Sequence, residues 1–171
     1  MKKNKIMNII FWGVFIFYLI LMLQLFFLRE QMELNAINLT PFRSITAGIY
    51  MQAGFQYIDV QVWGNVLVFV PAGIYVMILS KKNSMLKAFL ILFLTSLSVE
   101  TIQYTFRIGA GDIDDVILNS LGGIIGILLY CLLKKICKTK EKVKEMLTAI
   151  SFFVGVIIWG LTLVLFRVNF L

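Results

Sequence analysis

The sequence predicts an all-α protein, a polytopic bundle of about five transmembrane helices. Hydrophobic residues make up 60% of the 171-residue chain, and only 15% are charged, whereas about 25% is usual in soluble domains. A soluble domain of this size keeps a large share of its surface in water, so it cannot hide this much apolar side chain. The mean hydropathy is +0.92. These values exclude an ordinary soluble globule and a disordered chain.

Five apolar runs are long enough, or nearly long enough, to cross a ~30 Å hydrocarbon core, which takes about 20 helical residues. They are residues 6–28, 62–79, 86–106, 113–133 and about 150–166. The first follows three lysines, as a signal peptide would. It has no small-x-small cleavage site, and this favours a retained helix. We therefore expect a membrane domain over residues 1–133, followed by residues 134–171 with a basic inner loop and the fifth span.

The positive charges predict the orientation. If the N-terminus lies inside, the inner segments hold all twelve lysines and the outer segments hold all four arginines. Basic residues are enriched in cytoplasmic loops, so the N-terminus is predicted inside and the C-terminus outside. This topology explains the net charge of +7 without a nucleic-acid partner.

The residue types also limit the chemistry. The chain has no histidine, which removes His-based catalytic triads and His metal ligands. Cys131 and Cys137 have no CxxC spacing and offer no disulfide framework. No cofactor and no metal site are assigned.

Polar residues gather in the predicted outer halves of the spans, where their cost makes them functional candidates. Glu100, Gln103 and Arg107 are spaced i, i+3 and i+7, which places them on one face of the third span. Asp115 and Asn119 share a face of the fourth span. Because a short turn joins the two spans, these stripes are expected to face each other or a wet cavity.

The neighbouring spans contribute further features. Asn65 enters the second span at the same outer level, and Pro71 is expected to kink that helix, which either opens room for a ligand or adjusts packing. Gly122 and Gly126 form a small-xxx-small surface for a close helix contact, which is also compatible with a homo-oligomer. The outer connection 29–61 is too long for a simple turn and is expected to lie in the interface or to fold back over the bundle.

Four pieces in order carry a resemblance: Asn38-Leu39-x-Pro41-Phe42, Asn65-x-x-x-Phe69-x-Pro71-x-Gly73, Glu100-x-x-Gln103 with Arg107, and Asp112-x-x-Asp115-x-x-x-Asn119-x-x-Gly122. Over about residues 35–133 the chain resembles the VanZ-like family of bacterial membrane proteins. The resemblance implies the cytoplasmic membrane of a bacterium and a role in glycopeptide antibiotic tolerance, chiefly toward the lipid-tailed teicoplanin type. Asp114 stands where the family is more variable and receives less weight.

The first hypothesis is a binding site at the outer leaflet. Its members are polar side chains of the second to fourth spans: Asn65, Glu100, Gln103, Arg107, Asp112, Asp115 and Asn119. The permanent cation of Arg107 suits a phosphate or carboxylate. Besides membrane lipids, the expected partner is a lipid-linked wall precursor or the lipoglycopeptide.

Other functions stay open. An intramembrane enzyme would use Glu100 and Asp115 as paired acid and base, or Asp112, Asp114 and Asp115 as oxygen ligands of a divalent cation. A structural role would leave the polar groups satisfying one another. A transporter is less favoured, because no inverted repeat or broken helix pair is visible.

Overall fold

The computed structural model describes residues 2–27, 37–52, 55–58, 60–82 and 84–170. The chain divides into two compact units, which are described separately. The bundle unit is Leu21–Leu133, and the terminal unit combines Met1–Ile20 with Lys134–Leu171. Helices α1 (Lys2–Phe27) and α5 (Ile113–Cys137) contribute to both units.

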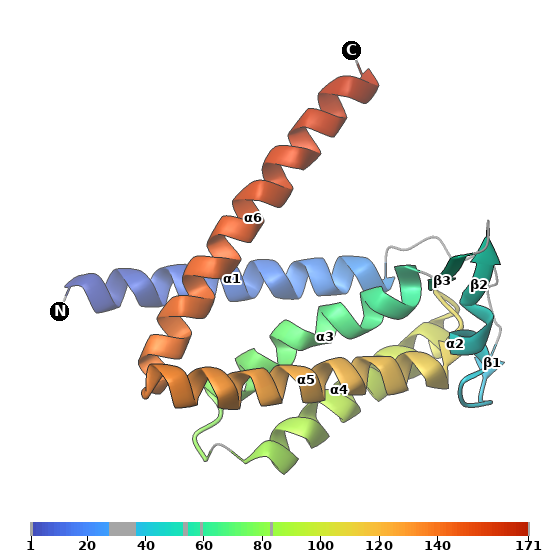
Figure 1. Ribbon diagram of the computed structural model, residues 1–171, viewed down its shortest axis with the longest axis horizontal. Helices are drawn as coiled ribbons and strands as arrows, with labels where there is room; N and C mark the ends of the chain where they lie inside the picture. Colours follow the sequence, from blue (N-terminus) through green and yellow to red (C-terminus); the bar gives the residue numbers. More distant parts are fainter. Residues whose placement is uncertain (1, 28–36, 53–54, 59, 83, 171) are drawn as a thin grey trace. The chain divides into compact units, whose positions relative to one another are not determined.

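In the bundle unit, α3 (Val60–Leu79), α4 (Met85–Phe106) and α5 run side by side (Figure 1). The short elements are β1 (Ile37–Asn38), α2 (Arg43–Ala47), β2 (Ile49–Gln52), β3 (Phe55–Ile58) and β4 (Gly111–Asp112). Strand β1 pairs in parallel with β4, and β2 pairs with β3 in an antiparallel hairpin. These strands are absent from the prediction, because two to four residues leave no periodic pattern to detect.

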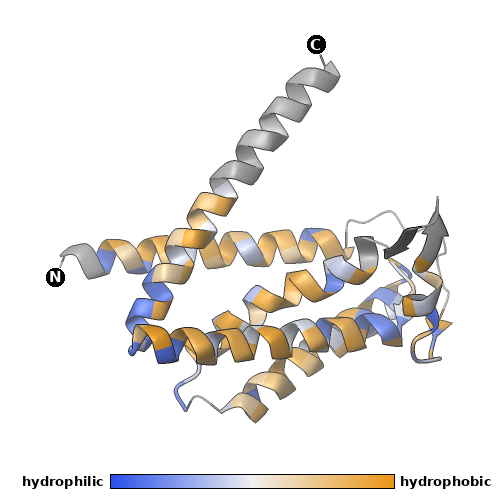
Figure 2. Ribbon diagram, in the orientation of Figure 1, coloured by the Kyte–Doolittle hydropathy of each residue, from blue (hydrophilic) through white to orange (hydrophobic). Residues whose placement is uncertain are grey.

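Four helices in the described part of the chain are long and apolar enough to cross a membrane. The apolar stretches are Lys5–Phe27, Val62–Leu79, Met85–Phe106 and Ile113–Cys137. They agree closely with the first four predicted spans and confirm an all-α membrane bundle. Hydrophobic residues cover the lengths of α3, α4 and α5, while hydrophilic residues concentrate toward the ends (Figure 2). The inside–outside orientation stays a prediction.

The glycines of α5 allow α3 to approach closely. A Cβ atom added at Gly122 would overlap the carbonyl oxygen of Val66, and one added at Gly126 would overlap that of Val70. The predicted small-residue contact is therefore used within the chain. Helix α3 occupies this glycine face, and the homo-oligomer stays a prediction. Helix α3 continues through Pro71.

In the terminal unit, α6 (Lys140–Phe170) is a single 31-residue helix. It contains both the end of the predicted basic loop and the predicted fifth span, whose crossing of the membrane stays a prediction. Lys144 connects α6 to α1: its Nζ donates to Asn8 Oδ1 at 2.6 Å and lies 4.2 Å from the centre of the Phe11 ring.

Candidate functional site

The candidate site forms where the long 29–61 connection meets the turn between α4 and α5. Residues 28–36, 53–54 and 59 of this region lie outside the described residues. Residues 37–48, here called the strap, fold back onto the bundle. Strand β1 places Ile37 beside Gly111 and Asn38 beside Asp112. A segment distant in sequence is thereby held at the ends of two predicted spans.

Asp112 links the strap to the turn. Its Oδ1 accepts a hydrogen bond from Asn38 Nδ2 at 2.9 Å, and its Oδ2 accepts one from Ser44 Oγ at 2.5 Å. Its backbone N–H donates to Glu100 Oε2 at 3.0 Å. The strap, the turn and α4 are thus joined through one residue, which explains why a polar residue is needed there.

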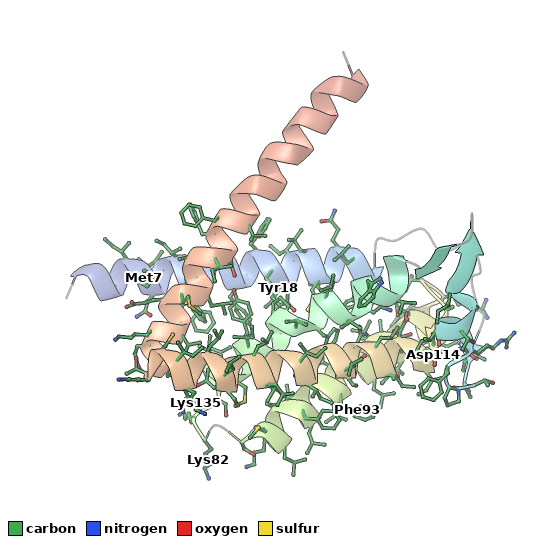
Figure 3. The ribbon with its side chains drawn as sticks, viewed as in Figure 1. Met7, Tyr18, Lys82, Phe93, Asp114 and Lys135 are labelled. Carbon is green, nitrogen blue, oxygen red and sulfur yellow. The ribbon has the colours of Figure 1, made fainter. Side chains whose placement is uncertain are left out.

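Asp114 makes the densest set of contacts. Its side chain is fully buried. Oδ1 accepts from the backbone N–H of Phe42 at 2.5 Å, and Oδ2 accepts from those of Ser44 at 2.7 Å and Ile45 at 3.2 Å. The first N–H groups of a helix have no partner within it, so this carboxylate caps α2. The label in Figure 3 marks Asp114 beside α2, at the opposite end of the bundle unit from Lys82.

Glu100 and Asp115 place two more carboxyls at the same end. Glu100 is buried on α4 and accepts a hydrogen bond from the backbone N–H of Asp112. Asp115 Oδ1 accepts from Asn65 Nδ2 at 2.5 Å, so α3 is tied to α5. The structure brings Asn65, Glu100, Asp112 and Asp115 to the same end of the bundle unit.

The remaining two buried amides hold the helices together below this level. Asn119 is fully buried, and its Nδ2 donates to Ser96 Oγ at 2.9 Å. Among the described residues its Oδ1 has no hydrogen-bond partner. Gln103 Nε2 donates to the carbonyl oxygen of Phe26 at 2.8 Å, which ties the end of α1 to α4.

Arg107 does not share the face that the spacing predicts. Helix α4 ends at Phe106, and Arg107 follows in the left-handed region with φ 56°. Its side chain is exposed, whereas Glu100 and Gln103 are buried. The predicted i, i+3, i+7 face is correct for the first two residues and wrong for Arg107, because the helix stops before its position.

We define the polar cluster as the seven side chains that meet at this end: Asn38, Ser44, Asn65, Glu100, Asp112, Asp114 and Asp115. In the sequence, Asn38 stands out only through the family resemblance, Asp114 receives less weight, and nothing singles out Ser44. The sequence signal for these residues was the acidic pair Asp112-x-Asp114 at the start of α5, because carboxylates are favoured near a helix N-terminus. The partners of those carboxylates lie too far along the chain for a local pattern to reveal.

Comparison with known proteins identifies the chain. The family model described as VanZ/LLP1 matches residues 15–134. The chain belongs to the VanZ/LLP1 family. It is similar to Protein VanZ of Enterococcus faecium, with 32% identity over 160 residues, which is 89% of each chain. No solved structure matches. The resemblance found in the sequence is therefore confirmed.

The region shared with the VanZ/LLP1 family contains the whole polar cluster and stops before α6. The carboxylates of Asp112 and Asp114 in this region are bound by hydrogen bonds from the strap. In the described part of the chain, no group of three or more acidic, Cys or His side chains is arranged to hold a metal ion. Two cations at this end, Arg43 and Arg107, have exposed side chains.

Proposed function

We propose that this VanZ-family protein reduces the susceptibility of its bacterium to teicoplanin-type lipoglycopeptides. It acts at the outer surface of the cytoplasmic membrane, where it binds a lipid-linked cell-envelope precursor or the antibiotic itself. The family membership supports the resistance role. The observation that carries the binding role is the polar cluster, since buried carboxyls in predicted spans are expensive and typically serve a purpose.

The cluster supports this role by fixing a cation-bearing turn. Asp112 N–H is bonded to Glu100, and Ile108 N–H donates to the carbonyl oxygen of Gln103 at 3.0 Å. The turn between α4 and α5 is thus held at both ends, and Arg107 projects from it with an exposed side chain. A guanidinium forms paired, charge-assisted hydrogen bonds with phosphate or carboxylate. Both proposed ligand classes offer such anionic groups.

Susceptibility testing in a teicoplanin-sensitive host checks the proposal. The host would express wild type, Glu100→Gln, Arg107→Ala and Asp115→Asn at matched membrane levels. Thr101→Val is the matched control, because Thr101 is exposed, neighbours Glu100, and its hydroxyl donates to the Leu97 carbonyl oxygen of the same helix. We expect wild type and the control to raise the teicoplanin inhibitory concentration and the three variants to lose that gain. Vancomycin, which lacks the lipid tail, should show little change.

Two outcomes would refute parts of the proposal. If wild type gives no teicoplanin-selective gain, the resistance role is wrong. If the three variants protect as well as wild type, the cluster is not the working site. Thermal unfolding of each purified variant separates loss of function from loss of folded protein, since a purely structural role predicts protection in proportion to the folded amount.

Two carboxyls at the same end of the bundle unit, Glu100 bonded to the Asp112 N–H and Asp115 bonded to Asn65, favour one second candidate. This candidate is an intramembrane enzyme that modifies an envelope lipid or peptide. In that case one carboxyl acts as general acid and the other as general base. A change in the lipid or muropeptide profile that requires both residues would support the enzyme over the binding protein. An unchanged profile alongside a full resistance phenotype would exclude it.

A further inference from the structure

The strap, residues 37–48, has two chemically different sides. Two of its polar side chains turn toward the bundle: Asn38 Nδ2 donates to Asp112 Oδ1, and Ser44 Oγ donates to Asp112 Oδ2. Thr40, Arg43 and Thr46 are exposed. Among the described residues, nothing covers two of its large apolar side chains: Leu39 is 70% and Phe42 59% exposed. In water this arrangement would be unfavourable, because exposing apolar area costs about 25 cal/mol per Å².

The uncovered side of the strap cannot turn inward without breaking the cluster. Phe42 N–H donates to Asp114 Oδ1, and the Phe42 carbonyl oxygen accepts from Thr46 N–H at 3.0 Å. The residue also has a left-handed backbone with φ 67°, which is unfavourable for a bulky side chain. The hydrogen bonds on both sides therefore hold the ring in its outward position.

The fastening points set the depth of the strap. Asp114 is the second residue of α5, so the strap docks within about one helical turn, or ~5 Å, of the point where that predicted span begins. The end of α4 is equally apolar and uncovered there: Phe106 is 70% exposed, and Ile108 is also exposed. The apolar side of the strap thus lies at the level where the lipid-facing surface of the spans ends.

We propose that the strap is an interfacial membrane element, with Leu39 and Phe42 inserted between the acyl chains of the adjacent lipid leaflet. A short segment that buries its apolar side at the headgroup boundary and keeps its polar side elsewhere is typical of monotopic elements. Arg43, which is exposed beside Phe42, is placed to extend its guanidinium toward lipid phosphates. The occupant of this surface is bilayer lipid. The proposal is independent of the resistance function.

Spin-label accessibility in bilayers tests the lipid contact. The full chain, with Cys131→Ser and Cys137→Ser, would be reconstituted into phosphatidylethanolamine–phosphatidylglycerol vesicles. Single labels would be attached through Leu39→Cys or Phe42→Cys. Leu97→Cys on the exposed surface of α4 and Lys82→Cys in the exposed α3–α4 connection serve as lipid and water references. Collision with oxygen, which concentrates in lipid, is compared with collision with a water-soluble nickel complex.

We expect the labels at residues 39 and 42 to favour oxygen, with depths between those of the two references. Labels that match the Lys82→Cys reference would overturn the proposal. Dipolar broadening between labels at residue 42, removed by dilution with unlabelled protein, would show a second copy on this surface and would overturn it equally. Asp114→Ala in the labelled background adds an internal check, because releasing the strap should alter the depth at residue 42.

Discussion

Removing the Asp114 carboxylate should release the strap from the bundle. This side chain is fully buried and accepts three backbone hydrogen bonds, from Phe42, Ser44 and Ile45. Asp114→Ala leaves all three N–H groups without their acceptor. Because β1 and the Asp112 contacts remain, the first consequence is local opening of the strap rather than unfolding of the helices.

The size of the effect follows from these bonds. Hydrogen bonds to charged groups contribute about 1.5–3 kcal/mol each, and a donor left buried without a partner costs about 1–3 kcal/mol. The two shorter bonds dominate, and water relieves part of the loss once the strap loosens, so the net change is about 3 kcal/mol. At 1.4 kcal/mol per tenfold, the open population rises about 100-fold. Asp114→Asn keeps one acceptor oxygen and should have a smaller effect.

Hydrogen–deuterium exchange measured by mass spectrometry in detergent or nanodiscs gives the readout. Peptides that cover the strap should exchange about 100-fold faster in Asp114→Ala, in line with the population change, while peptides from α4 should change little. Thr101→Ala is the control. Unchanged exchange in the strap would refute the capping role, and equal acceleration in α4 would show that Asp114 supports the whole bundle instead.

Two further predictions concern helix contacts. Gly126→Ala should destabilise the bundle by about 1–3 kcal/mol, because the added methyl group overlaps the Val70 carbonyl oxygen. Gly13→Ala is the control, because its methyl group meets open space. Equal thermal midpoints for the two variants would contradict the close contact. Desolvation by burial lowers the pKa of Lys144 from its ordinary 10.5, against the opposing effect of Glu141. Between the lowered pKa and 10.5 the unfolded chain binds the proton more tightly than the folded chain, so the free energy of unfolding should rise with pH. Lys144→Met should flatten this dependence of stability on pH, measured as the thermal midpoint at several pH values. Identical pH dependence in the two proteins would contradict the prediction.

The first four spans were predictable from the sequence because hydropathy and length are properties of consecutive residues. The predicted run 62–79 coincides with the apolar stretch of α3, and the run 86–106 differs by one residue from α4. The contact between Glu100 and Asp112 was also predictable, since a short turn between two antiparallel helices brings their ends together. The helical period and the turn length together decide those positions.

The tertiary structure alone decided which groups these carboxyls bind. Asn38 and Asp112 are 74 residues apart in the sequence, and Phe42 and Asp114 are 72 apart. No local period relates such positions, so Asp114 looked like a minor member of the site although it makes the most hydrogen bonds to the strap. The exposure of Arg107 was not predictable for a related reason. A helical spacing predicts a shared face only while the helix continues, and α4 ends at Phe106, with Arg107 in the left-handed region. Hydropathy determined which segments are predicted to cross the membrane. Long-range hydrogen bonds from the strap to Asp112 and Asp114 determined how the polar residues at the end of the bundle unit are paired.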